Sequence, residues 1–125
     1  MKALSIKQPW ADLIIWGFKS IETRTWKTDY RGKLLICSSK TIDRKAMRDF
    51  KPLFPEDHQF LIGKALGVAE LVDCTKMKDF HQGFALCDLY HGYSWILETA
   101  KEIEPFDVKG QLGLFEVNYT EVNQW

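Results

Sequence analysis

Basic and aromatic side chains lie close together along residues 5–32, and this pairing is what a single-stranded nucleic acid needs from a protein. A cationic side chain meets a phosphate group, while a nearby ring stacks on a base and contributes about 1–3 kcal/mol. Instead of stacking on a base, Trp10 could pack in the core at the start of a helix, and Trp26 could lie away from the edge of the groove. The candidate pairs are Lys7 with Trp10, Arg24 with Trp26, and Tyr30 with Arg31.

Four charged side chains could form one hydrogen-bonded network: Lys19, Glu22, Arg24 and Glu70. Glu22 and Arg24 alternate along an expected strand, so they share one face of it. They form either a buried, oriented pair or a solvated pair of small energetic consequence. Lys19 points to the opposite face unless the turn after Gly17 rotates it. Glu70 is either an ordinary surface acid or a partnered one, because a carboxylate is seldom buried alone.

Two short polar segments could contact phosphate groups. Ser38 and Lys40 follow an expected strand and offer a hydroxyl and a cation, although a strand exit before a helix cap explains this segment equally well. Arg31 precedes a glycine and either clamps a phosphate or belongs to a solvated turn. The sequence has no phosphate-binding P-loop, no GxGxxG motif and no GxSxG motif, so we expect no cofactor.

Composition narrows the classes of protein. The 125 residues are 46% hydrophobic and 14% aromatic, which excludes a disordered chain and predicts a single domain over residues 1–125. No apolar run approaches the ~20 residues of a membrane-spanning helix, so we expect a cytoplasmic protein with no membrane partner. Three cysteines without a CxxC pair and three histidines without an HxxxH spacing predict neither disulfides nor a metal site.

The net charge of zero conceals an asymmetry. Residues 1–51 carry twelve Lys/Arg against five Asp/Glu, a net +7, and the remainder carries five against twelve, a net −7. If the basic segment lies on one face, its field attracts polyanions; if the fold mixes the two halves, the charges average out. We predict one positive groove with the acidic half facing away. Its cations are Lys7, Lys19, Arg24, Arg31 and Lys40.

Periodicity places these residues on short strands and two short helices. Strands are expected over 3–7, 19–26, 33–38, 63–73, 93–99 and 114–118, with a short piece at 103–104. Helices are expected over 9–16, ended by a left-handed Gly17, and over 41–50. Residues 76–92 are irregular or weakly helical, and Gly67 predicts a bulge or a close backbone approach. This pattern favours a small β-barrel over a stack of βαβ units.

Several motifs in order resemble the ASCH family, which is named for homology to a domain of activating signal cointegrator. They are LSIKQPWADLIIWGFKSIETRTW with YRGKLLI, the central ELVDC, and the closing WIL, IEP and KGQLGLF. The resemblance covers nearly the whole chain. It implies an α+β fold of the PUA-like class: a mixed, partly open β-barrel of about six strands with short flanking helices and a groove for nucleic acid.

The resemblance also implies which residues line that groove. The family's groove positions correspond to Lys19, Glu22 and Arg24, with Glu70 as a groove acid near Lys19. A Lys–Glu couple can move a proton when desolvation shifts one pKa towards neutrality. The candidate nucleic-acid-binding residues are Lys7, Gln8, Trp10, Lys19, Glu22, Arg24, Trp26, Arg31, Ser38 and Lys40.

Three functions follow, of which we favour the first. We predict a nucleic-acid-binding module for RNA, single-stranded RNA above all, or for a modified nucleotide, and expect a role in transcription or RNA processing. Alternatively it is a hydrolase that uses Lys19 and Glu70, because one branch of the superfamily hydrolyses N4-acetylcytidine through a K-x-x-T run and another cleaves RNA. Here Glu22 occupies the threonine position of that run, which disfavours catalysis. The third function is a protein-interaction adaptor; the sequence specifies neither protein partners nor an oligomeric state.

Overall fold

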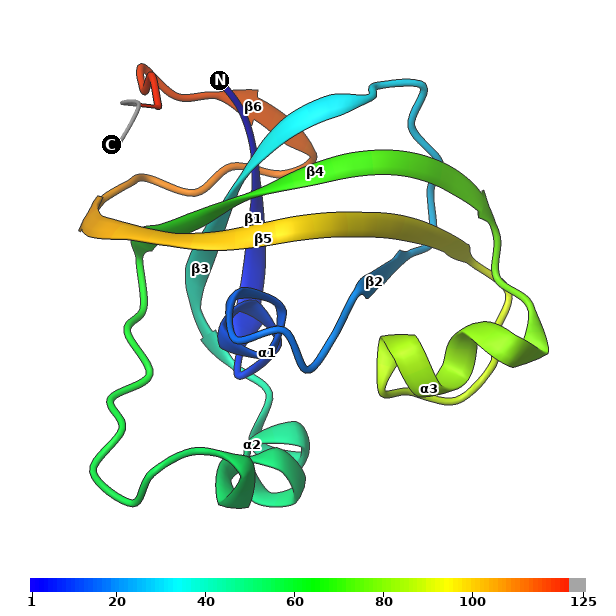
Figure 1. The fold of residues 1–125 in the computed structure, drawn as a ribbon, viewed down its shortest axis with the longest axis horizontal. Coiled ribbons are helices and arrows are strands. Elements are labelled where there is room, and N and C mark those ends of the chain that lie inside the picture. Colours follow the sequence, from blue (N-terminus) through cyan, green and yellow to red (C-terminus); the bar gives the residue numbers. More distant parts are fainter. Residues whose placement is uncertain (122–125) are drawn as a thin grey trace.

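Six strands form one curled, mixed sheet in the computed structural model, which describes residues 1–121 (Figure 1). The strand order is β2-β5-β4-β3-β1-β6. β1 runs parallel to β3, and the other neighbouring strands are antiparallel. No ladder joins β2 to β6 within residues 1–121, so the expected partly open α+β barrel is confirmed. The strands are β1 (Lys2–Gln8), β2 (Ile21–Arg24), β3 (Gly32–Ile42), β4 (Lys64–Lys76), β5 (Tyr93–Asp107) and β6 (Leu114–Glu116).

Short helices accompany this sheet. The helix expected over 9–16 is confirmed as α1, and the one expected over 41–50 begins only at Arg44, because residues 41 and 42 still belong to β3. Figure 1 shows α1 beside the sheet, with α2 and α3 further out. Gly17 follows α1 with a φ of 84°, as a left-handed helix end requires. None of the helices described in residues 1–121 is long and apolar enough to cross a membrane. They are α1 (Trp10–Ile15), α2 (Arg44–Phe50), the 3-10 turns η1 (Lys51–Leu53) and η2 (Asp79–His81), and α3 (Gln82–Ala85).

The expected break between 93–99 and 103–104 is wrong, because both segments belong to the continuous strand β5. Thr99 has a φ of 53° inside this strand, and register shifts along β4 absorb the irregularity. The prediction for Gly67 is confirmed: a Cβ there would overlap the Lys101 carbonyl oxygen and lie 2.5 Å from Ile15 Cδ1. A glycine therefore lets β5 and α1 approach β4.

Two core clusters lie on the two faces of β3, which is buried on both sides, and a third, smaller cluster is formed by Ile21, Met77 and Ala85. Leu34 and Ile36 point into the main cluster with Trp95, whereas Leu35 and Cys37 point into a second cluster with Phe115 and Val68. This is the burial that the apolar run 33–38 predicted. The indole of Trp95 is fully buried, and it supports the site described next.

Candidate nucleic-acid groove

A buried ionic network begins at the turn between α1 and β2. The backbone N–H groups of Phe18 and Lys19 both donate to the Leu13 carbonyl, at 2.9 and 3.0 Å. This turn brings Lys19 to the same side as Glu22, with 3.5 Å between Nζ and Oε1. The Lys19 ammonium also donates to the Ala85 carbonyl at 2.6 Å. Only 2% of the Lys19 side chain is exposed, so its charge is fully engaged inside the protein.

Glu22 joins this lysine to Arg24. The Arg24 Nη2 atom lies 3.0 Å from Glu22 Oε2, and Nε donates to the same oxygen at 3.2 Å. Arg24 Nη2 also donates to the Ser5 carbonyl at 3.1 Å. Because β1 and β2 are not neighbours in the sheet, Arg24 bridges the open side of the barrel. These contacts hold the guanidinium in a fixed orientation.

Trp10 lies above the network and is fixed from three sides. The Lys19 ammonium is 4.8 Å from the centroid of its ring, within the range of a cation–π contact. The indole N–H donates to Asp43 Oδ2 at 3.0 Å, and the Phe50 ring lies 5.4 Å away. Asp43 also accepts from the Ala46 N–H, and these two hydrogen bonds lower the pKa of its carboxyl group. Trp10 thus packs against the core and also lines the cavity described below.

Trp26 forms the opposite wall. Its ring meets the Trp95 ring edge-on at a centroid distance of 4.8 Å. The Trp95 indole N–H donates to the Trp26 carbonyl at 3.3 Å. A half-buried indole supported in this way is a rigid surface on which a flat ligand can stack.

These side chains enclose a cavity of about 330 Å³ on the open side of the barrel. Five of the predicted residues line it, namely Lys7, Trp10, Glu22, Arg24 and Trp26. Its other lining residues are Ser5, Ile6, Thr23, Thr25, Ser39 and Tyr90. The cavity therefore combines two indole rings, a fixed guanidinium, a carboxylate and the exposed Lys7.

A larger hollow of about 1030 Å³ adjoins it and shares Ser5, Arg24 and Ser39 with it. Lys40, Lys64 and Lys109 line this second hollow. We call the two cavities together the basic groove. The lining offers indole surfaces on which a flat ring can stack and lysines that can bind anionic groups.

The ASCH domain family matches the sequence over residues 4–107, which contain the whole Lys19–Glu22–Arg24 network. The chain belongs to the ASCH domain family. It is 34% identical over 92 residues to activating signal cointegrator 1 of Homo sapiens and, to the same extent, to that of Mus musculus. Each match covers 65% of this chain but only 16% of the cointegrator, so the chain spans a small part of these relatives.

Solved ASCH structures share the fold. The crystal structure of ASCH from Zymomonas mobilis superposes with a TM-score of 0.67, covering 94% of this chain and 87% of that one at 11% identity. A mutant of the same protein gives a TM-score of 0.64 at 12% identity, covering 94% of this chain and 89% of that one. At such low identity the likeness establishes the shared fold, a partly open α+β barrel, and nothing about ligands.

Glu70 does not join the network of this ASCH domain. On β4, Glu70 pairs with Lys33 of β3 and with Glu98 of β5. Burial raises the pKa of the Tyr30 phenol, and the negative charge of Glu70 raises that pKa further. In the sheet, Glu22 of β2 pairs with Trp95 of β5, and Trp95 in turn pairs with Cys74 of β4. Cys74 is four residues further along β4 than Glu70. That offset is about 13 Å along a strand. The predicted Lys19–Glu70 couple is therefore wrong as a geometric expectation.

Ser38 lines the groove, whereas Gln8 lines neither cavity, and the polar groups of both residues bind the protein itself. Gln8 is fully buried, and its amide donates to Asp12 Oδ1 at 2.9 Å and to the Leu61 carbonyl at 2.8 Å. Ser38 is buried, and its hydroxyl accepts from the Lys64 N–H at 3.2 Å. The Gln8 side chain thus joins the end of β1 to α1 and to the segment before β4, and the Ser38 hydroxyl joins β3 to the start of β4.

The predicted charge separation is only partly correct. Lys7, Arg24 and Lys40 line the groove, and Lys19 lies buried beside it. Arg31 lies outside both cavities: it donates to the carbonyl oxygens of residues 28 and 30, and its guanidinium is 3.5 Å from a carboxylate oxygen of residue 73. The acidic half does not simply face away, because it contributes Lys64, Lys109 and Asp107 to the groove.

Sequence reasoning missed Tyr90, Thr25, Lys64 and Lys109 as lining residues. No local pattern marks Lys64 and Lys109, which meet only because the start of β4 pairs with the end of β5. Tyr90 lies in an irregular segment. Among residues 1–121, no group of three or more His, Cys, Asp or Glu side chains is placed to hold a metal ion.

Proposed function

We propose that this ASCH domain binds single-stranded nucleic acid, RNA in particular, in the basic groove. The observation that carries the proposal is the position of Arg24, which is held by Glu22 and the Ser5 carbonyl where the two cavities meet. A guanidinium fixed at this junction can bind the phosphate that links a base in one cavity to the backbone in the other. Residues 1–125 act as one domain in this proposal.

The first cavity suits one nucleobase. Its volume of about 330 Å³ is at the lower end of cavities that enclose small organic ligands. The indoles of Trp10 and Trp26 offer stacking surfaces, and stacking contributes about 1–3 kcal/mol per base. The Glu22 carboxylate can accept hydrogen bonds only, so it favours a base that presents an N–H group. A modified base with such a group falls within this proposal.

The second cavity suits the sugar-phosphate backbone. Lys40 and Lys109 are exposed there and make no ion pair with another residue of the range 1–121, whereas Lys64 pairs with Asp107. With Lys7 at the first cavity, these residues provide three available cations. Phosphate contacts by these three lysines and by Arg24 predict that the affinity for a single strand falls about 50-fold between about 50 and 200 mM salt.

Hydrolysis by Lys19 and Glu70 is not part of this proposal. The Lys19 ammonium already contacts the Ala85 carbonyl and Glu22, and Glu70 lies on another part of β4. Incubation with N4-acetylcytidine tests the alternative directly. Turnover that Lys19→Ala abolishes would replace binding by catalysis as the function of the groove.

The decisive experiment measures anisotropy of a labelled RNA of about 12 nucleotides over a range of salt concentrations. We expect Lys7→Ala and Lys40→Ala each to weaken binding and to reduce the salt slope by about 0.7. Arg31→Ala is the matched control, because Arg31 is a nearby exposed arginine outside both cavities. A loss of binding in Arg31→Ala with no change in the two lysine variants would refute the groove. Affinity that is independent of salt would refute the function.

A further inference from the structure

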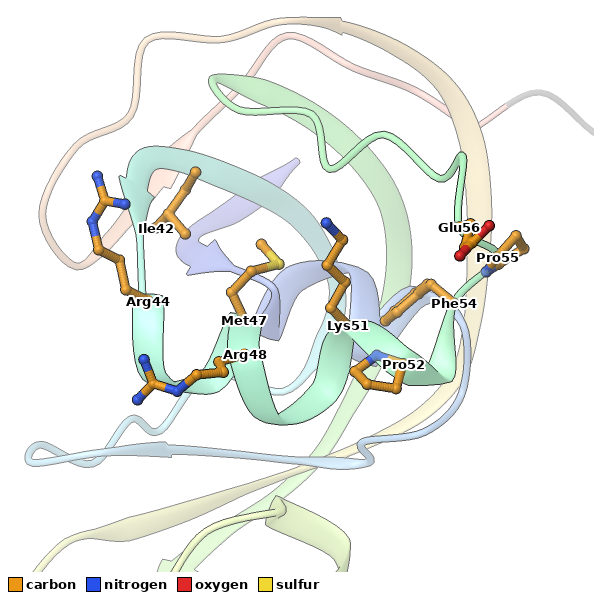
Figure 2. Close-up of a pocket in the computed structure, with 9 residues that line it drawn as sticks. All are labelled: Ile42, Arg44, Met47, Arg48, Lys51, Pro52, Phe54, Pro55 and Glu56. Atoms are coloured by element: carbon orange, nitrogen blue, oxygen red, sulfur yellow. The ribbon is translucent and has the colours of Figure 1, made fainter.

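A third hollow lies along α2 and shares no lining residue with the basic groove. It measures about 1140 Å³ and is formed by the end of β3, α2, η1 and the segment that follows η1 (Figure 2). Its apolar lining includes Ile42, Met47, Pro52 and Phe54. We call it the α2 hollow. Nothing in the proposed function uses it.

Three cations border the α2 hollow on successive turns of the chain. Arg44, Arg48 and Lys51 are spaced i, i+4 and i+7, so they share one side of α2 and η1. None of the three forms an ion pair with another residue of the range 1–121. Lys45 differs, since its ammonium lies 3.0 Å from Asp49 on the same helix. The three cations are therefore available to an external acidic group.

The apolar side chains of the α2 hollow differ in mobility: the Phe54 ring is held by its neighbours, whereas the Met47 side chain is flexible. Phe54 is only 6% exposed, and its ring packs against Trp16 at 4.7 Å and His58 at 4.8 Å between centroids. Met47 is half-buried and flexible, and the Ile42 side chain is 41% exposed. Methionine and arginine are enriched in protein interfaces, and methionine adapts its shape to different partners.

We propose that the α2 hollow binds an acidic, amphipathic segment of a partner protein. The apolar side chains of the segment pack against Met47 and Ile42, which the buried Phe54 ring supports from below, while its carboxylates pair with the cations, as in helix-in-groove recognition. Figure 2 shows Arg44 and Arg48 at one end of the hollow and Glu56 at the other. The acidic residues of the partner therefore lie at the Arg44–Arg48 end.

Nucleic acid fits this surface less well than a protein segment does. The hollow has one aromatic lining residue, Phe54, and the burial of its ring leaves no face for a base to stack on. Glu56 also lies at its edge and would repel phosphate groups. The basic groove has the opposite character, with two half-buried indoles and a row of lysines.

The test records amide chemical shifts of the whole chain during titration with a designed peptide of about 16 residues, with leucines on one helical face and glutamates on the polar face of one half only. We expect shift changes concentrated at residues 42–56 and none at the basic groove. Arg48→Glu should weaken binding about tenfold. Lys45→Glu is the matched control, since it reverses a charge on the same helix outside the hollow, and its affinity should not change.

Three results would overturn the proposal. A scrambled peptide that distributes the leucines around the helix and binds equally well would show charge attraction without a docking surface. A labelled RNA that shifts residues 42–56 when the peptide does not would assign the hollow to nucleic acid. Shift changes at residues 42–56 that follow the protein concentration in the absence of peptide would show that a second copy of the chain binds the α2 hollow. None of these results bears on RNA binding in the basic groove, so the two proposals fail independently.

Discussion

Replacing Glu22 by glutamine should destabilise the protein more than any surface substitution, because Glu22 neutralises a buried lysine. The Lys19 side chain is 2% exposed and that of Glu22 is 9% exposed, with 3.5 Å between Nζ and Oε1. Removing one partner of a buried ion pair typically costs about 3–5 kcal/mol, since the other charge stays buried without compensation.

The structure sets the expected cost near the lower end of that range. Lys19 keeps its hydrogen bond to the Ala85 carbonyl and its contact with the Trp10 ring in the Glu22→Gln variant. Arg24 contributes little to the loss, because 24% of its side chain is exposed and solvent screens its charge. We therefore expect the free energy of unfolding to fall by about 3 kcal/mol. A domain with about 5–15 kcal/mol of stability stays folded after such a loss.

Urea denaturation followed by circular dichroism measures this change. With a slope of about 2 kcal/mol per molar urea, the midpoint should fall by about 1.5 M. A double-mutant cycle with Lys19→Met isolates the pair: the double variant should be more stable than the sum of the two single effects predicts, by about 2 kcal/mol. Glu104→Gln, at an exposed position of β5, is the control and should stay within about 0.5 kcal/mol of the parent.

A Glu22→Gln variant that loses less than about 1 kcal/mol would refute the role of Glu22 as the partner of a buried lysine. Additive effects in the cycle would refute it as well, since they would mean that Lys19 and Glu22 do not stabilise each other. Either result would mean that the network contributes no more stability than a solvated surface pair. Glu22 would then give no reason for a fixed orientation of Arg24.

Three further predictions concern the fold around the groove. Gly67→Ala should lower the urea midpoint strongly, because the added methyl group would overlap the Lys101 carbonyl oxygen, and an unchanged midpoint would contradict this close approach. Asp43→Ala should cost about 1 kcal/mol as a lost helix cap and should shift Trp10 fluorescence. Hydrogen bonds from the backbone and from Trp10 lower the pKa of Asp43. The stabilisation that Asp43 provides is therefore complete above the ordinary carboxyl pKa and is lost as pH falls through the lowered value. As a result, the difference in urea midpoint between the parent and the Asp43→Ala variant should shrink in acid. Burial raises the pKa of Cys37 to about 12, so a thiol reagent at pH 8 should label it only after unfolding, and labelling of the native protein that Cys37→Ala reduces would contradict its burial.

Local sequence determined much of the fold and the rim of the groove. Alternation identified β1 and β2, the apolar run identified β3 as buried on both faces, and Gly17 identified the end of α1. Four groove residues lie in one short stretch of the sequence, and β1, α1 and β2 bring them to one cavity. They are Lys7, Trp10, Arg24 and Trp26. The same alternation places Gln8 on the face of Leu4 and Ile6, so its burial was readable from the sequence.

Long-range strand pairing decided the rest. Lys19 and Glu70 are separated because the register of β4 with β5 sets Glu70 about four residues away from the level of Glu22. Lys64 and Lys109 reach the groove because β4 begins where β5 ends. Local patterns carry the burial preference of each residue, but the register between distant strands depends on how whole faces pack, and that is settled only when the barrel forms.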